Sequence, residues 1–442
     1  MSSVSSGPCI LIPAFPELFM NDRHARWALA LSLALPSLAL PSLSHATNGY
    51  FSHGVGVRSQ GVAGTGIALP QDGLAAASNP AGTALVGHRL DIGMSWFKPS
   101  RSARISDNGA APDERYDGDG REHFFIPELG YVRPLGDDLA IGVAVYGNGG
   151  MNTDYRRNPF ARFGSQGAAG VDLAQAFITP SIAWKPHTRH SVGAAVTFAY
   201  QRFAVKGLSA FDNAFFSSAP GSVTDRGHDT STAWGLKLGW IGQVTDTVAL
   251  GLTWSSKLKA DRFERYEGLF AERGAFDIPE SYGAGVAWKV TPSLTLASDW
   301  QRIEYSGVRS VGRALSPLLA GNPLGAADGP GFGWRDISVL KFGAVYDYCT
   351  RLTLRGGFSR TQQPIPADQT FLNIIAPGVV RNHWTIGATW RTDGGGEWSM
   401  SYIHAPKETV RGRNSIPGAF GAGEADISLK EDILGVAYTW KL

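Results

Sequence analysis

The amino-acid sequence predicts an all-β fold: a transmembrane antiparallel β-barrel of about 14 strands, with an N-terminal segment that plugs the lumen. Hydrophobic segments with period-two alternation recur along the chain, separated alternately by short turns and long polar loops. In the last segment one parity is apolar or aromatic, and it comprises Leu434, Val436, Tyr438, Trp440 and Leu442. Such a strand presents one face to lipid and the other to a polar lumen.

Composition disfavours a helical membrane protein. Only 18% of the 442 residues are charged, yet beyond the N-terminal segment no stretch reaches the roughly 20 apolar residues that a spanning helix needs. A soluble all-β protein is the alternative, but it would have to bury the aromatic residues that fall on the apolar parity of nearly every segment. We therefore expect strands to cross the membrane.

The lengths of segments and connections predict the orientation. From residue 89 onward, about 14 segments approach the roughly 9 to 11 residues of a tilted spanning strand. Clear examples are 139–146, 191–201, 248–255, 294–301, 341–348 and 383–391. Short turns on one side and long loops on the other are typical of outer-membrane barrels with both termini in the periplasm. Tryptophans near segment ends fit the headgroup level of a bilayer, among them Trp288, Trp300, Trp384 and Trp398.

The N-terminal 46 residues have the organisation of a secretory signal peptide. Residues 23–26 carry two arginines and a histidine, residues 27–43 form the one long apolar stretch, and Ala46 ends a small-residue cleavage site. We therefore expect a signal peptide at 1–46. The residues before Met20 contain three prolines and a glutamate and make a poor charged region, so Met20 is the favoured initiator.

Residues 47–88 differ from the rest of the mature chain because they are rich in glycine and alanine and only weakly periodic. They are too many for a tail and too few for a domain, so we expect them inside the barrel as a hatch, with the barrel itself at 89–442. Glycine suits this place because it lets backbone pass close to the lumen wall. The pair Gly54 and Gly56 does not indicate a nucleotide site, since no strand precedes it in a βαβ unit.

Charge and motifs exclude several classes of function. The formal net charge is +2 and the basic residues are dispersed, so no basic stripe indicates nucleic-acid binding. No GxSxG stands on a strand-to-helix turn, and we expect neither an enzyme nor catalytic residues. His187 and His190 share one short connection, but that turn lacks further metal ligands. We expect no metal and no cofactor.

Several motifs resemble the FadL and TodX family of outer-membrane transporters of long-chain fatty acids and hydrophobic aromatics. Gly61-Val62-Ala63-Gly64-Thr65-Gly66 and Asn79-Pro80-Ala81-Gly82 are similar to the N-terminal hatch of that family. A second run of matches extends from Trp334-Arg335-Asp336 through Leu354-Arg355-Gly356-Gly357 and Pro364-Ile365-Pro366 to Ile386-Gly387. The resemblance covers essentially the whole mature chain and is carried by the order and spacing of the motifs together.

The resemblance implies a pathway for the ligand. A hydrophobic molecule, above all a long-chain fatty acid, would bind in the barrel, pass the hatch at Asn79–Gly82 as this segment moves, and leave through a lateral opening in the third strand. In this chain the third segment ends at Gly147, Asn148, Gly149 and Gly150. Glycines weaken strand pairing and permit a bulge or gap, although a glycine-rich loop start would look the same.

By the same resemblance, Arg202 and Arg335 would hold the ligand head group. Arg335 has the parity of an inward residue, whereas Arg202 shares parity with Phe198 and Tyr200 and faces inward only if a bulge intervenes. The family's neighbouring serine is Gly147 here. For both arginines the alternative is a charge that keeps the wall hydrated.

The long loop from Phe203 to Thr230 carries a group of apolar side chains. Phe211, Phe215 and Phe216 would form a first capture site above the membrane, and packing within the loop itself is the alternative.

The resemblance places the protein in the outer membrane of a Gram-negative bacterium, as a monomer with outer-membrane lipid and the barrel-assembly machinery as partners. Three alternative functions stay open: an uptake channel for monoaromatic hydrocarbons, a non-selective aqueous porin, and an outer-membrane lipid hydrolase. A porin predicts many inward charges, but only a few are evident, including Lys237, Asp299, Lys341 and Arg355.

Overall fold

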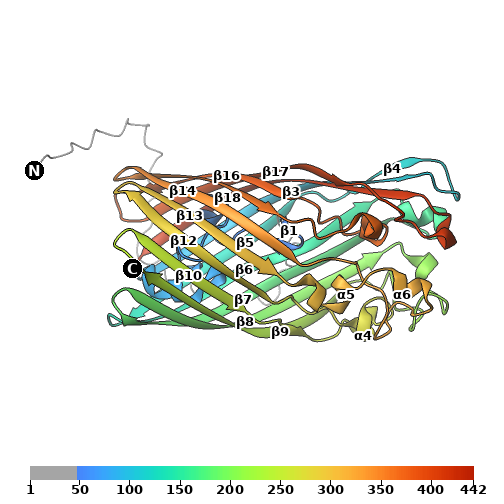
Figure 1. Cartoon of the computed structure of the whole chain (residues 1–442), viewed down its shortest axis with the longest axis horizontal. Helices are drawn as coiled ribbons and strands as arrows, with labels where there is room; N and C mark the ends of the chain where they lie inside the picture. Colours follow the sequence, from blue (N-terminus) through green and yellow to red (C-terminus); the bar gives the residue numbers. More distant parts are fainter. Residues whose placement is uncertain (1–46) are drawn as a thin grey trace, which may run out of the picture. The chain divides into compact units, whose positions relative to one another are not determined.

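The computed structural model describes residues 47–442, and the expected signal peptide and the start at Met20 lie outside the described residues. Fourteen antiparallel strands form a closed barrel (Figure 1), because β18 pairs with β3 along its whole length. The predicted fold class is thus confirmed. The strands are β3 (Arg89–Ser106), β5 (Phe124–Leu135), β6 (Leu139–Tyr155), β7 (Ala169–His187), β8 (His190–Lys206), β9 (Asp229–Gln243), β10 (Val248–Ser255), β12 (Ser281–Thr291), β13 (Leu294–Ile303), β14 (Ile337–Cys349), β15 (Leu352–Thr361), β16 (Asn382–Arg391), β17 (Glu397–Val410) and β18 (Glu424–Lys441).

Alternation of side chains sorts each strand into an outer and an inner face. Along β3, Met94 and Trp96 are exposed while Ser95 and Phe97 are buried. The exposed outer face is apolar, as a lipid-facing surface must be. Trp288, Trp300, Trp384 and Trp398 all lie on it. Within residues 47–442, no helix has the length and apolar character needed to cross a membrane.

The hatch begins with two short strands and continues with short helical turns. They are β1 (Thr47–Asn48), β2 (Phe51–Ser52), α2 (Val57–Gln60), α3 (Ala75–Ser78) and the 3-10 helix η1 (Pro80–Leu85). The turns of η1 contact β6, β7, β8 and β9, and α2 contacts β16, β17 and β18. The segment therefore crosses the lumen and touches both sides of its wall.

The inner wall lets the hatch backbone approach because glycines face it. A Cβ added at Gly193 would overlap the Pro80 carbonyl carbon, one at Gly239 would overlap Asn79 Oδ1, and one at Gly251 would overlap the Ile67 carbonyl oxygen. Each site thus needs a residue without a side chain. From the sequence we expected glycines in the hatch to allow this close approach. The structure shows that glycines of the barrel wall are needed for it as well.

The outer loops carry further short elements, drawn at one end of the barrel in Figure 1. They are β4 (Glu114–Asp117), η2 (Pro159–Phe163), η3 (Ser209–Phe211), β11 (Lys259–Ala260), η4 (Glu264–Tyr266), α4 (Ala271–Gly274), η5 (Tyr305–Gly307), α5 (Arg309–Gly312), α6 (Ser316–Leu319), η6 (Ala367–Gln369), η7 (Leu372–Ile374) and η8 (Gly418–Phe420).

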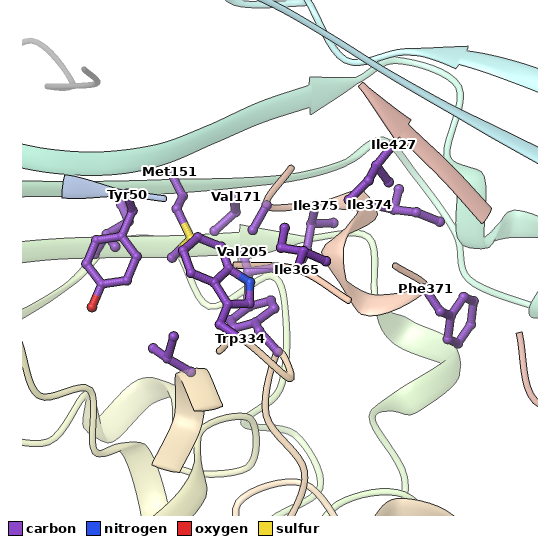
Figure 2. Packing of buried hydrophobic residues seen from close by; sticks show 14 of the residues in the cluster. Tyr50, Met151, Val171, Val205, Trp334, Ile365, Phe371, Ile374, Ile375 and Ile427 are labelled. Atoms are coloured by element: carbon purple, nitrogen blue, oxygen red, sulfur yellow. The ribbon is translucent and has the colours of Figure 1, made fainter. Parts of the chain in front are cut away.

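The main apolar core joins hatch, wall and loops. Figure 2 shows Tyr50 of the hatch, Met151 of β6 and Trp334 of an outer loop in one cluster. The rings of Tyr50 and Trp334 lie 5.6 Å apart. Folding of the loops is thereby coupled to docking of the hatch.

Adding a methyl group at one wall glycine tests the close approach of the hatch backbone to the wall. We expect Gly239→Ala to lower the free energy of unfolding by about 1–3 kcal/mol, because the new methyl group displaces Asn79. Gly356→Ala is the matched control, since the nearest atom to its added Cβ is 3.8 Å away. Urea unfolding of the purified protein in micelles measures both, and equal unfolding midpoints would contradict the packing described here.

Candidate functional site

A pocket with about 830 Å³ of empty space, part of it open to solvent, lies in the lumen between the hatch and the wall. The hatch contributes Phe51, Val55 and Ile67 to its lining, and the wall contributes Tyr146 and Phe177, whose rings meet edge to face at 5.5 Å. Polar wall residues complete the lining, among them Asn148, Thr197, Lys237, Thr253, Asp299, Gln301 and Lys341. The cavity thus offers apolar surface beside a few charged and polar groups, which is the usual composition of a ligand pocket.

Two of the charged groups fasten the hatch. Asp299 accepts hydrogen bonds from the backbone N–H groups of Gly66 (2.8 Å) and Ile67 (3.0 Å). Lys341 donates to the carbonyl oxygens of His53 (3.1 Å) and Gly64 (3.3 Å). Both side chains are buried, and their bonds are made to hatch backbone. A ligand would have to displace the hatch to reach them.

Lys237 of β9 differs from these two. Its ammonium group donates to the Ala77 carbonyl oxygen, which is its one hydrogen bond within residues 47–442. An ammonium carries three donors, and this one lines the cavity. Lys237 is therefore the cation best placed to meet an anionic group in the lumen. The sequence identified it as an inward charge without giving it a role.

The ring of His53 in the hatch packs against that of His383 in β16, with centroids 4.4 Å apart and the planes tilted by 31°. Ser359 Oγ lies 3.3 Å from Nδ1 of His53 and 3.4 Å from Nδ1 of His383. Burial, then the neighbouring His383 and Lys341, holds the pKa of His53 well below its ordinary value. A neutral imidazole allows this ring to pack closely against the wall.

The predicted hatch motif is an anchor in this structure. Asn79 is fully buried, and its amide donates to the carbonyl oxygens of Ile67 (2.7 Å), Trp240 (3.1 Å) and Leu252 (3.1 Å). Asn79 Oδ1 accepts from the Ala81 N–H, and Pro80 begins η1. Gly82 packs against Pro70. Because Trp240 and Leu252 belong to β9 and β10, the motif is bound to the wall at a seam between two strands.

The predicted lateral opening coincides with an irregularity in β6. The register between β6 and β7 shifts between Gly147 and Gly149, so Asn148 is left out of the ladder. The hatch lies on this point: Phe51 of β2 pairs with Gly149, and Gly150 N–H donates to the Tyr50 carbonyl oxygen (3.1 Å). Asn148 lines the cavity and donates to Gln175 Oε1 (3.2 Å). The four predicted residues therefore meet the hatch and the cavity at one place.

A second cavity, of about 500 Å³, lies among the outer loops. Its lining is almost wholly apolar and includes Phe160, Phe211, Phe270 and Phe332. Of the three predicted loop phenylalanines, Phe211 lines this cavity and Phe216 packs behind it with ring centroids 5.8 Å apart. Phe215 is 81% exposed. The structure thus divides the predicted capture cluster into a lining, a supporting and an exposed residue.

The two predicted arginines lie outside the lumen cavity. Arg202 shares the outward parity of Tyr200, without a register shift at this point of β8, and its Nη2 lies 3.4 Å from Asp172 Oδ2. Its position gives no support to a contact with a ligand inside the barrel. Arg335 is exposed beside the buried Trp334. The family resemblance assigned both arginines to the ligand head group but could not resolve where each side chain points.

These features define a class of protein: an outer-membrane barrel plugged by a hatch, with an apolar cavity among its outer loops and a lumen cavity beside a break in strand pairing. The chain belongs to the family of outer-membrane transport proteins described as OMPP1/FadL/TodX, which matches residues 42–441. It is an outer-membrane protein of the type that transports hydrophobic compounds.

Solved structures share the fold at low sequence identity. A FadL homologue of Pseudomonas aeruginosa is 17% identical with a TM-score of 0.66, covering 89% of this chain and 99% of its own. The toluene transporter TodX of P. putida is 17% identical with a TM-score of 0.63, covering 88% and 99%. The toluene transporter TbuX of Ralstonia pickettii is 18% identical with a TM-score of 0.61, covering 88% and 98%. No curated protein matches the sequence.

Removal of the Asn79 amide tests the anchor. We expect Asn79→Asp to raise ion conductance across a planar bilayer, because a carboxylate cannot donate to the three carbonyl oxygens and the hatch loosens. Asn322→Asp, in an outer loop, is the control and should conduct like the unmodified protein. An Asn79→Asp channel as silent as the control would show that the motif does not hold the hatch.

Proposed function

We propose that this protein takes up a hydrophobic molecule with an anionic head group, and that long-chain fatty acids are its main ligands. The observation that carries the proposal is the position of Lys237. Its ammonium group lines a lumen cavity that has both apolar and polar walls, and it donates one hydrogen bond, to a backbone carbonyl oxygen. A carboxylate in this environment needs a cation or hydrogen-bond donors, since burial without them is costly. A monoaromatic hydrocarbon would leave the Lys237 ammonium group with the Ala77 carbonyl oxygen and no anionic partner.

The proposed path follows the two cavities. The apolar cavity among the outer loops takes the ligand first, with Phe211 in its lining. An acyl chain gains about 0.8 kcal/mol per buried methylene, so the loops can extract it from water without any polar contact. The ligand then enters the lumen cavity, where the head group meets Lys237.

Release occurs at the break in β6. Asn79 is bound to the seam between β9 and β10, so the hatch motif stays in place and the first hatch segment, at Tyr50 and Phe51, moves. This segment is attached to β6 at Gly149 and Gly150. Its displacement would join the lumen cavity to the gap beside Asn148. The ligand can drive this displacement only if it binds more tightly to the protein with the hatch segment displaced than to the protein with the segment in place.

Uptake of monoaromatic hydrocarbons is the second candidate. The outer cavity is almost wholly apolar and would accept a neutral ring as readily as an acyl chain. Solved structures with this fold include toluene transporters. An open aqueous porin is less well supported, because the hatch is bound to the wall on several sides. We assign no catalytic role, and we expect a monomer that is inserted by the barrel-assembly machinery.

Uptake of labelled oleate and toluene by cells that lack their own transporter separates the two candidates. We expect oleate uptake, with about a tenfold higher half-saturating concentration in Lys237→Met, because one charge-assisted contact to the head group is lost. Lys407→Met, on the exposed outer end of β17, is the matched control and should transport like the unmodified protein.

Each other outcome has a distinct meaning. Toluene uptake that is indifferent to Lys237→Met, without oleate uptake, would favour the aromatic channel. If oleate uptake is unchanged in Lys237→Met, the proposal that this lysine binds the head group is wrong. Arg335→Ala in the same assay tests the remaining predicted arginine, and we expect no change because that side chain is exposed at the outer end.

A further inference from the structure

The outward face of β8 changes character along its length. Val192, Phe198 and Tyr200 are exposed to the surroundings of the barrel, and the next outward positions are Arg202, Ala204 and Lys206. Because two residues of a strand span roughly 7 Å, Arg202 lies just beyond the aromatic residues. Aromatic side chains of a barrel mark the membrane interface. Arg202 therefore lies at the headgroup level of the outer leaflet, and Lys206 lies further out along the same strand.

Basic side chains from neighbouring segments lie near two carboxylates, Asp172 and Asp154. Asp172 Oδ2 of β7 lies 3.0 Å from His228 Nε2, 3.4 Å from Arg202 Nη2 and 3.6 Å from Arg121 Nη1. Lys206 pairs with Asp154 at 2.8 Å. We call Arg121, Arg202, Lys206 and His228 the outer cation cluster. Its three permanent positive charges are paired with these two carboxylates.

Two of the cations are more exposed than the carboxylate Asp172. The side chain of Asp172 is 14% exposed and that of Arg202 23%, whereas those of Arg121 and Lys206 are each 45% exposed. An anion that approaches from the membrane therefore meets guanidinium and ammonium groups first. Asp172 holds two arginines close together at a fixed spacing, which reduces the ordering needed for a bidentate contact.

We propose that the outer cation cluster binds a phosphate group of a phosphorylated glycolipid in the outer leaflet. Guanidinium groups match phosphate geometry in a bidentate manner, and clusters of basic residues at the membrane surface recognise anionic headgroups. Acyl chains of the same lipid would lie along Tyr200 and Phe198 below the cluster. This site is on the outer face of the barrel and is independent of the transport path.

Binding of a lipid with and without its phosphates tests the proposal. The probe is diphosphorylated lipid A in detergent micelles, titrated onto the immobilised mature protein, with dephosphorylated lipid A in parallel. We expect the R121Q/R202Q double variant to bind the phosphorylated probe roughly tenfold or more weakly than the unmodified protein, because two charge-assisted contacts are lost. Arg189→Gln is the matched control: it removes an exposed arginine that is also paired with an aspartate, Asp246 (2.7 Å), but lies in a turn at the opposite end of the barrel. It should bind like the unmodified protein.

Folding of each variant is verified by heat-modifiable electrophoretic mobility, and Arg121→Gln alone is used if the double variant fails to fold, since its side chain is about half exposed. Unchanged affinity in the folded variant would overturn the proposal, as would equal affinity for the two lipids or equal loss in Arg189→Gln. Displacement of the lipid by inorganic phosphate at equal concentration would also overturn it, because the site would then recognise the free ion.

Discussion

Close approach of the hatch backbone to the inner wall is the constraint on which the site depends. Gly193, Gly239 and Gly251 leave room for Pro80, Asn79 and Ile67 respectively. Only at this separation can the Asn79 amide reach carbonyl oxygens of β9 and β10. A buried amide without partners would cost about 1–3 kcal/mol, so wall glycines and the hatch asparagine are required together. The position of the lumen cavity follows from how the hatch is held.

Much of the fold could be predicted from local sequence. Period-two alternation determines which side chain meets lipid in most of the barrel strands, because each strand is paired on both sides, and it is lost in β6, where residues 146–153 are all buried. The break at Gly147–Gly150 was also visible, since three glycines in four positions weaken a strand. The wall glycines were not predictable as a docking surface: their meaning depends on which strand lies opposite the hatch, and that is a property of the closed barrel.

The candidate site was predicted less well, for a physical reason. Arg202 was proposed to hold a ligand from family resemblance, although its parity with Phe198 and Tyr200 opposed an inward direction. In the structure parity prevails and the side chain pairs with Asp172. Lys237 had the inward parity but no motif around it. Alternation thus located these side chains better than resemblance did, because pleating is enforced by backbone geometry while a ligand contact can move between strands.

The lumen cavity and the β6 break form one mechanical unit. Tyr50 links them: its carbonyl oxygen accepts a hydrogen bond from Gly150 N–H, and its ring packs on Trp334 in the core of the outer loops. In the proposed uptake path, a ligand that displaces Trp334 would therefore act on the same hatch residue that is bound to the break. Asn79, held at the opposite seam, gives this movement a fixed end. On this proposal, entry and exit would be coupled without motion of the barrel strands themselves, because each strand is hydrogen-bonded to a neighbour on both sides.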